Sequence, residues 1–217
     1  MSKIKGDAIQ IGSSVTASQN CTLTANGDGT FTLARGNIGA TTDDLLTIDA
    51  NGVVTAENGI ITNRLVSETA ITTTSGTEHD FTNIPSWVKR ITVMFNGVST
   101  NGTSSKLIQL GDSGGVETTG YLGASSSLDT VVASSSYTTG FGIRSVFATS
   151  ILHGSLIITN IDGDEWVCQG TFSLSNTART ITVSGSKILS ATLDRIRITT
   201  LNGTDTFDAG AINIQYE

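Results

Sequence analysis

The sequence predicts an all-β protein. Glycine accounts for 24 of the 217 residues, and only 14% of the residues are charged, against a usual charged share of about 25%. Serine, threonine and asparagine fill the remaining polar positions, and these residues suit turns and the surfaces of sheets better than helices. No stretch longer than two turns has the 3.6-residue periodicity of an amphipathic helix, whereas short runs of alternating apolar and polar residues recur along the chain.

The first third of the chain is polar and repetitive. Residues 23–32 are echoed by residues 46–55: each begins with an apolar-threonine pair, continues through Asn-Gly and ends in a short strand pattern. Asn-Gly between such runs favours a β-hairpin. Isolated hairpins are marginally stable in water, so these segments either pack on the following domain or wrap with identical chains around a shared narrow core. Residues 57–67 form a connector, helical or extended. We therefore expect an attachment or shaft segment at residues 1–66.

The clearest strand pattern follows Pro85, the only proline of the chain. Ile91, Val93 and Phe95 occupy alternate positions, which places them on one face of a half-buried strand. Because Pro85 fixes its own φ, we expect the chain to turn into the sheet there. Trp87 follows this corner, and we expect it to pack over one end of the core.

Residues 67–217 contain about eight to ten strand patterns separated by turns, a spacing typical of a β-sandwich or jelly roll. We expect this head domain to have a loop-rich stretch up to about residue 139. The expected strands are residues 71–75, 80–96, 106–111, 142–148, 150–160, 165–174, 180–183, 195–199 and 211–216.

The charge balance bears on partners and location. A net charge of −7 and a pI near 4.7 argue against binding to nucleic acid or an anionic membrane. No apolar run approaches the ~20 residues of a membrane-spanning helix. The amino terminus has neither the apolar stretch of a secretory signal nor a glycine after Met1, so we expect synthesis in a cytoplasm without membrane insertion.

One motif resembles a catalytic nucleophile. Residues 111–115 read Gly-Asp-Ser-Gly-Gly, as around the reactive serine of trypsin-like proteases, which also need a histidine base and a buried aspartate. His79 precedes Ser113 by only 34 residues (113 − 79), and His153 follows it. This order does not fit the two-barrel protease layout. A glycine-rich loop after a strand explains the same residues.

The other reactive side chains lack ligand spacing. Residues 162–165, Asp-Gly-Asp-Glu, suit a hairpin turn better than a calcium loop, which needs six or more spaced oxygens. The two histidines are not spaced as metal ligands, and we expect no metal and no cofactor. We expect no disulfide between Cys21 and Cys168, and we expect Cys168 and Trp166 to be buried in strands. A pair of catalytic carboxylates among the nineteen acidic residues stays open, because sequence does not give their separation.

A candidate ligand-contacting patch lies in the predicted loops. Tyr121 and Tyr137 stand near the serine runs 125–127 and 134–136, a mixture typical of adaptable recognition surfaces. We expect Tyr121, Tyr137, Phe141 and Arg144 to contact a ligand there, with ordinary loop residues as the alternative interpretation.

Three regions of the sequence carry a resemblance to known proteins: residues 23–37 with 51–54, residues 80–99, and the closing residues 194–199 with 209–214. They resemble the tail-fibre and virion structural proteins of bacteriophages. The resemblance implies a homotrimer, an amino-terminal segment attached to other virion tail proteins, and a distal β-domain that contacts the host. It supplies no catalytic residues.

These observations favour a subunit of a phage tail fibre that binds a bacterial surface glycan or protein and is not an enzyme. The resemblance implies that it resides in the virion tail. The alternative is a virion structural protein without a host ligand, such as a capsid decoration or fibre connector. A third hypothesis is an enzyme acting on envelope polysaccharide. Adsorption to host cells separates the first two, and release of products from polysaccharide identifies the third.

Overall fold

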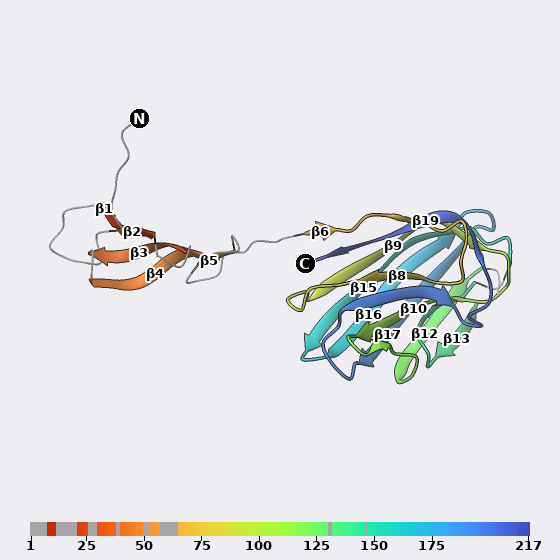
Figure 1. Ribbon diagram of the computed structural model, residues 1–217. Coiled ribbons are helices and arrows are strands. Elements are labelled where there is room, and N and C mark those ends of the chain that lie inside the picture. The colour runs from red at the N-terminus through yellow and green to blue at the C-terminus, as the bar shows by residue number, and fades with distance from the viewer. Residues whose placement is uncertain are drawn as a thin grey trace, which may run out of the picture. The chain divides into compact units, whose positions relative to one another are not determined.

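The structure is a computed structural model that describes residues 8–11, 21–25, 30–37, 40–49, 53–56, 65–129, 132–145 and 147–217. The chain divides into two compact units, residues 1–63 and residues 64–217, each described here by itself. Every regular element in the described ranges is a β-strand (Figure 1), which confirms the prediction of an all-β protein. The sequence patterns predict the boundary between the first segment and the head domain after residue 66, whereas the first compact unit ends at residue 63.

The first unit is an antiparallel sheet of five strands in chain order. They are β1 (Ala8–Ile11), β2 (Cys21–Ala25), β3 (Phe31–Asn37), β4 (Ala40–Ile48) and β5 (Val54–Ala56). Strands β2 and β3 pair with Leu23 opposite Leu33, and β4 pairs with β5 with Ile48 opposite Val54. The two repeated segments therefore form hairpins, while their Asn-Gly dipeptides lie outside the described residues. Most of the 57–67 connector lies outside them as well.

The second unit contains two antiparallel sheets. Its strands are β6 (Val66–Ser67), β7 (Ile71–Thr72), β8 (His79–Thr82), β9 (Arg90–Thr100), β10 (Lys106–Asp112), β11 (Gly115–Val116), β12 (Tyr121–Leu128), β13 (Ala133–Tyr137), β14 (Phe141–Ile143), β15 (Leu152–Asp162), β16 (Glu165–Leu174), β17 (Arg179–Ile188), β18 (Arg195–Thr200) and β19 (Phe207–Tyr216). The larger sheet has the order β13-β12-β17-β16-β15-β9-β19-β6, with β7 also on β19. The smaller sheet has the order β11-β10-β18-β8, with β14 also on β10.

The core lies between these two sheets, in a sandwich-like arrangement (Figure 1). Ile91, Val93 and Phe95 of β9 are buried, as their alternation predicts. Phe95 meets Phe172 of β16 edge to face, with 5.5 Å between ring centroids, a favourable aromatic geometry. The smaller sheet contributes Ile108 and Ile198 to the same cluster. The jelly-roll connectivity and the trimer stay predictions.

Several sequence expectations are corrected. Residues 121–128 and 133–137, expected in loops, form strands β12 and β13. Their serines suggest loops, but each strand pairs along its length with a neighbour that satisfies its backbone groups. The expected strand at 142–148 is limited to β14. Trp87 packs against Tyr216, a buried member of the core cluster, as expected, although 44% of the Trp87 surface stays exposed.

Other buried positions follow the predictions. Trp166 and Cys168 are buried on the inner side of β16. Both cysteines are free thiols, and burial raises the pKa of Cys168 to about 12, so its sulfur stays protonated at neutral pH. No described segment forms a helix of the length and apolarity that crossing a membrane requires.

Candidate functional site

The larger sheet has one face on the core and one face directed away from it, which we call the outer face. Strand register aligns outer-face positions into rows that cross the sheet, because residues directly opposite each other lie on the same side. One row crosses eight strands. It consists of Ser136, Ala124, Ser184, Gln169, Ile157, Thr92, Gln215 and Ser67.

The next row has the same character. It consists of Ser134, Ser126, Thr182, Thr171, Ser155, Met94 and Asn213. Neither row contains a charged side chain, although the chain carries nineteen acidic and twelve basic residues. Hydroxyl and amide groups, separated by a few aliphatic ones, therefore form a neutral polar surface across the sheet.

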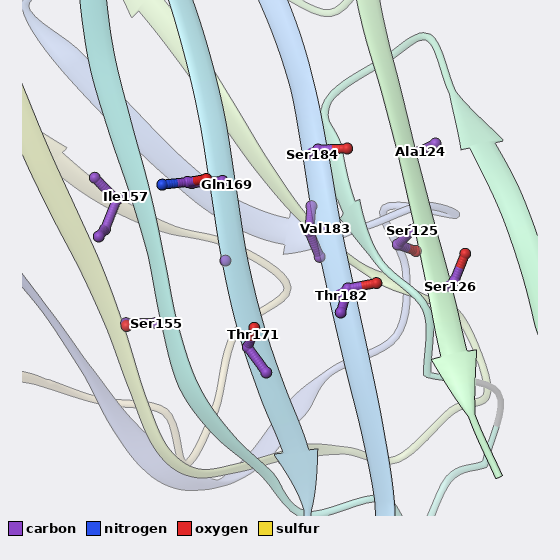
Figure 2. Close-up of a pocket in the computed structure, with 11 residues that line it drawn as sticks. Ala124, Ser125, Ser126, Ser155, Ile157, Gln169, Thr171, Thr182, Val183 and Ser184 are labelled. Carbon is purple, nitrogen blue, oxygen red and sulfur yellow. The ribbon is translucent and has the colours of Figure 1, made fainter.

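A groove of about 580 Å³ lies in the middle of these two rows. Figure 2 shows its lining side chains on four neighbouring strands, with Gln169 and Thr171 on β16 and Thr182 and Ser184 on β17. Ile157 supplies an aliphatic surface at one side. The volume lies within the range of about 300–1,000 Å³ common for ligand pockets.

The chemistry of the groove is that of hydrogen bonding without charge. Each hydroxyl both donates and accepts, and the Gln169 amide offers two donors and one acceptor oxygen. The 11 lining residues include no acid, base, histidine or cysteine. These groups match a neutral, hydroxyl-rich ligand, and the lining holds no histidine, carboxylate or amine that would activate one of its serine or threonine hydroxyls as a nucleophile.

Two further hollows continue the groove on the same sheet. One, of about 380 Å³, is lined by Leu122, Ala124 and Ser136 among others, and the second, of about 530 Å³, by Ile157, Thr159 and Val167 among others. Ser184 lines all three. An extended ligand would therefore have room along the face from one hollow to the next, with Ser184 at the centre.

The aromatic residues chosen from sequence lie in the core. Tyr121 is 1% exposed, Tyr137 4% and Phe141 0%. The Tyr121 hydroxyl accepts the Leu110 N–H at 2.6 Å, and burial raises the pKa of Tyr121. Its ring meets Phe141 edge to face at 5.1 Å. These rings pack in the interior and form no exposed recognition patch, because the segments that carry them are strands with inward positions rather than loops.

Tyr137 and Arg144 complete this correction. The Tyr137 hydroxyl lies 3.1 Å from Ser105 Oγ, and its ring covers Gly142, where an added Cβ would lie 2.3 Å from the ring. Arg144 is half-buried, and its backbone N–H donates to Ser125 Oγ. Arg144 is thus joined to a residue that lines the groove, but the four predicted side chains do not meet at one surface.

The protease-like motif is a turn between β10 and β11. Asp112 Oδ1 accepts the Gly114 N–H at 2.7 Å, and Ser190 Oγ donates to Asp112 Oδ2. The contacts of the histidines lie elsewhere: His79 packs on Phe207, and His153 Nδ1 accepts the Gly97 N–H. The predicted glycine-rich turn explains the motif.

The acidic motif is also a turn. Asp162 pairs with Glu165, so Gly163 and Asp164 form a two-residue connection between β15 and β16. Gly163 has φ of +48°, the left-handed conformation that favours glycine. The predicted hairpin is confirmed. The part of the chain that the structure describes contains no group of three or more potential metal ligands.

The groove residues were missed because each is an ordinary strand residue. The available signal was the alternation in residues 167–173 and 180–186, which places Val167, Gln169, Thr171 and Ser173 on one side. Only the register of four strands, set by contacts distant in sequence, brings these residues beside Ser184 and Ser155. Comparison of the chain with protein-family models, curated proteins and solved structures found no match.

Proposed function

We propose that the chain is a subunit of a bacteriophage tail fibre whose second unit binds a neutral glycan on the bacterial surface. The observation that carries this proposal is the uncharged groove of about 580 Å³ on the outer face. Hydroxyl and amide side chains can exchange hydrogen bonds with sugar hydroxyls, while Ile157 contacts the apolar C–H face of a sugar ring. The resemblance of residues 23–37, 80–99 and 194–199 to segments of fibre proteins supports the assignment to a virion tail.

The mechanism is multivalent. A hydrogen bond that replaces one to water contributes about 0.5–1.5 kcal/mol, so one groove holds a sugar weakly. Three grooves on one homotrimer raise the effective concentration of each further contact and give avidity without a strong single site. The first unit attaches to other virion tail proteins, and the protein is made in the host cytoplasm.

Adsorption of the purified full-length protein to host cells, and to polysaccharide isolated from them, tests the proposal. Ser184→Arg places a long side chain at the centre of the groove, and we expect it to lower the bound protein about tenfold, the effect of losing roughly 1.4 kcal/mol. Ser113→Arg, at the exposed β10–β11 turn, is the matched control. Unaltered adsorption by a folded Ser184→Arg variant would overturn the groove as the contact site.

A second candidate is a virion structural protein without a host ligand. Leu122 and Ile188 are 75% and 66% exposed on strands of the same sheet, and an uncharged face with exposed aliphatic side chains also suits another protein. Wild-type protein that assembles into virions but adsorbs to no cell or polysaccharide would favour this candidate.

The proposed protein is not an enzyme. Glycoside cleavage requires a pair of carboxyl groups beside the bound sugar, and the groove lining has none. Release of soluble sugar from purified polysaccharide would contradict this part of the proposal.

A further inference from the structure

The three hollows of the outer face join into one continuous strip. The largest, of about 580 Å³, shares Ala124 and Ser184 with the hollow of about 380 Å³. It shares Ile157, Gln169 and Ser184 with the hollow of about 530 Å³. Together the hollows cross β13, β12, β17, β16 and β15, which are consecutive strands of the larger sheet. Neighbouring strands lie about 4.8 Å apart, so this outer-face strip is about 19 Å long.

The outer-face strip runs across the strands, and this is also the uncharged direction of the face. Beyond the strip, one of the two uncharged rows continues through Thr92, Gln215 and Ser67 on β9, β19 and β6. Along the strands the outer-face positions lead instead to charge, with Glu165 at the first residue of β16 and Arg90 at the first residue of β9. An uncharged path for an extended ligand therefore crosses the strands.

The polar side chains of the strip are not used by the protein itself. Four of them are exposed: Gln169, Thr171, Thr182 and Ser184. In the part of the chain that the structure describes, none of these four side chains forms a hydrogen bond within the protein. Asn160, in contrast, donates its side-chain amide to two backbone carbonyl oxygens. The amide and hydroxyls of the strip thus keep their donors and acceptors for an external partner.

The strip contacts a ligand from one side only. Every lining residue of the three hollows belongs to one of the five strands except Thr138, which follows β13. Aliphatic side chains recur along it, with Leu122 on β12, Val167 on β16 and Ile157 on β15. Sugar rings have apolar C–H faces that fit such positions. A surface of this shape encloses no single sugar, so its contacts accumulate along a row of units.

We infer that the outer-face strip binds the interior of a linear, uncharged polysaccharide that lies across β13, β12, β17, β16 and β15. One interstrand spacing is close to the length of one pyranose unit in an extended chain, so each strand meets roughly one unit. The inference rests on the proposed glycan-binding function and deepens it, because it specifies a chain interior instead of a terminal sugar.

Binding of size-sorted fragments to the full-length protein tests the inference. The probes are neutral fragments from partial hydrolysis of the polysaccharide of an adsorbing host strain, and calorimetry gives the Kd of each. We expect the Kd to fall at least about tenfold between fragments of about two and five units, because each added unit reaches another strand. A single unit that binds as tightly as five would overturn the inference and leave the proposed function standing. Absence of binding to the intact polysaccharide would overturn both.

The mass of protein bound to each polysaccharide chain provides a second measurement. A strip that takes interior units binds many copies along one long chain, so the bound mass should rise in proportion to chain length. A constant bound mass at every chain length would show that the protein recognises the chain end, which contradicts the inference.

Substitutions at the two ends of the strip distinguish it from a single central site. Ser136→Arg on β13 and Thr159→Arg on β15 each obstruct one end. We expect each to raise the Kd of the five-unit fragment about tenfold, whereas the two-unit fragment, which still has the other end, should change less than about threefold. Ser113→Arg, the same substitution at the β10–β11 turn, is the control. Unchanged binding of the five-unit fragment by both end variants, with loss of binding in Ser184→Arg, would confine the ligand to the central groove and overturn the inference.

Discussion

Lys106 is a charged residue inside the sandwich. It lies on β10 between the sheets with none of its surface exposed, and its ammonium donates to Ser145 Oγ at 3.4 Å. Burial lowers its pKa to about 8, while Asp205 and Asp208 act in the opposite direction and limit the shift. A basic group with a lowered pKa in the folded state destabilises that state below the folded pKa, because the unfolded chain holds the proton more tightly.

Replacement of Lys106 should therefore stabilise the protein. The pKa depression from 10.5 to about 8 corresponds to an upper limit of about 3 kcal/mol, and an apolar residue of similar length removes this cost. We expect Lys106→Met to raise the free energy of unfolding by roughly 1–3 kcal/mol at pH 7. Between pH 8 and 10.5 the stability of the wild type relative to the variant should increase, because only the wild type carries the buried amine and both carry Cys168, whose raised pKa acts in the opposite direction above about pH 9.

Urea unfolding at several pH values measures both effects. Lys89→Met makes the same chemical change at an exposed position and should alter stability by less than about 0.5 kcal/mol. A less stable Lys106→Met variant would show that the buried ammonium contributes favourable contacts that outweigh its desolvation.

At the scale of elements, one polar cluster joins β11, β17 and the loop after β17. Lys187 is 5% exposed and pairs with the Glu117 carboxylate, which also accepts the Ser190 N–H at 2.6 Å. Burial opposes ionisation of Glu117, but the hydrogen bonds from Lys187 and Ser190 outweigh it and lower its pKa. Hydrogen bonds from Ser190 and Gly114 likewise lower the pKa of Asp112. Hydrogen bonds to the two carboxylates thus connect the β10–β11 turn, the segment after β11 and the loop after β17.

Acid should release this cluster. A carboxylate with a lowered pKa in the folded state contributes stability above its unfolded pKa, and this contribution is lost as the pH falls through the folded pKa. We expect the wild type to lose stability progressively below about pH 4.5, the ordinary value for glutamate. Glu117→Gln should be less stable by about 1–3 kcal/mol at pH 7 and should lose less on acidification.

Thermal unfolding at pH 7, 5 and 3 tests this expectation. The control is Glu217→Gln, which removes an exposed pair with Arg90 and should cost less than about 1 kcal/mol. Identical pH profiles for Glu117→Gln and wild type would contradict a role of this carboxylate in acid stability.

The pairing of β9 with β19 depends on Gly210. Its φ is +95°, and an added Cβ would lie 2.4 Å from the Gly97 carbonyl oxygen at a shift in strand register. We expect Gly210→Ala to lower the free energy of unfolding by more than about 2 kcal/mol, because steric overlap adds to the cost of the left-handed backbone. Gly163→Ala, where the added Cβ meets nothing within 4 Å, should cost about 1 kcal/mol. Equal losses for the two variants would show that the register shift absorbs the overlap.

At the scale of the whole molecule, the proposed trimer makes a direct prediction. Light scattering on a sizing column should give the full-length protein a mass near three times 22.5 kDa. Among the positions of the first unit whose burial the structure describes, the buried ones are Thr22, Thr32 and Ala34, of which only Ala34 is apolar. A monomer would contradict the shared amino-terminal arrangement and favour a first unit that folds without partner chains.

Sequence revealed the fold class better than the site. Local alternation is sufficient to place β9, β16 and the β15–β16 turn, because side-chain period and turn chemistry are properties of neighbouring residues. The sequence patterns around Tyr121 and Tyr137 predict loops, because serine-rich segments are common in loops. In the structure these segments are strands, because pairing with neighbouring strands satisfies their backbone hydrogen bonds. The groove was not predictable in this way, because Gln169 and Ser184 become neighbours only through the pairing of β16 with β17.

The two uncharged rows have a further consequence for the proposed attachment, which concerns the salt concentration of the medium. A protein of net charge −7 is repelled by an anionic cell envelope over the Debye length, about 30 Å at 0.01 M salt and about 10 Å at 0.1 M. Dissolved salt shortens the range of that repulsion but leaves neutral hydrogen-bonded contacts intact, because the two rows contain no charged side chain. If the proposed function is correct, we expect attachment by this face to be slower at 0.01 M salt than at 0.1 M salt.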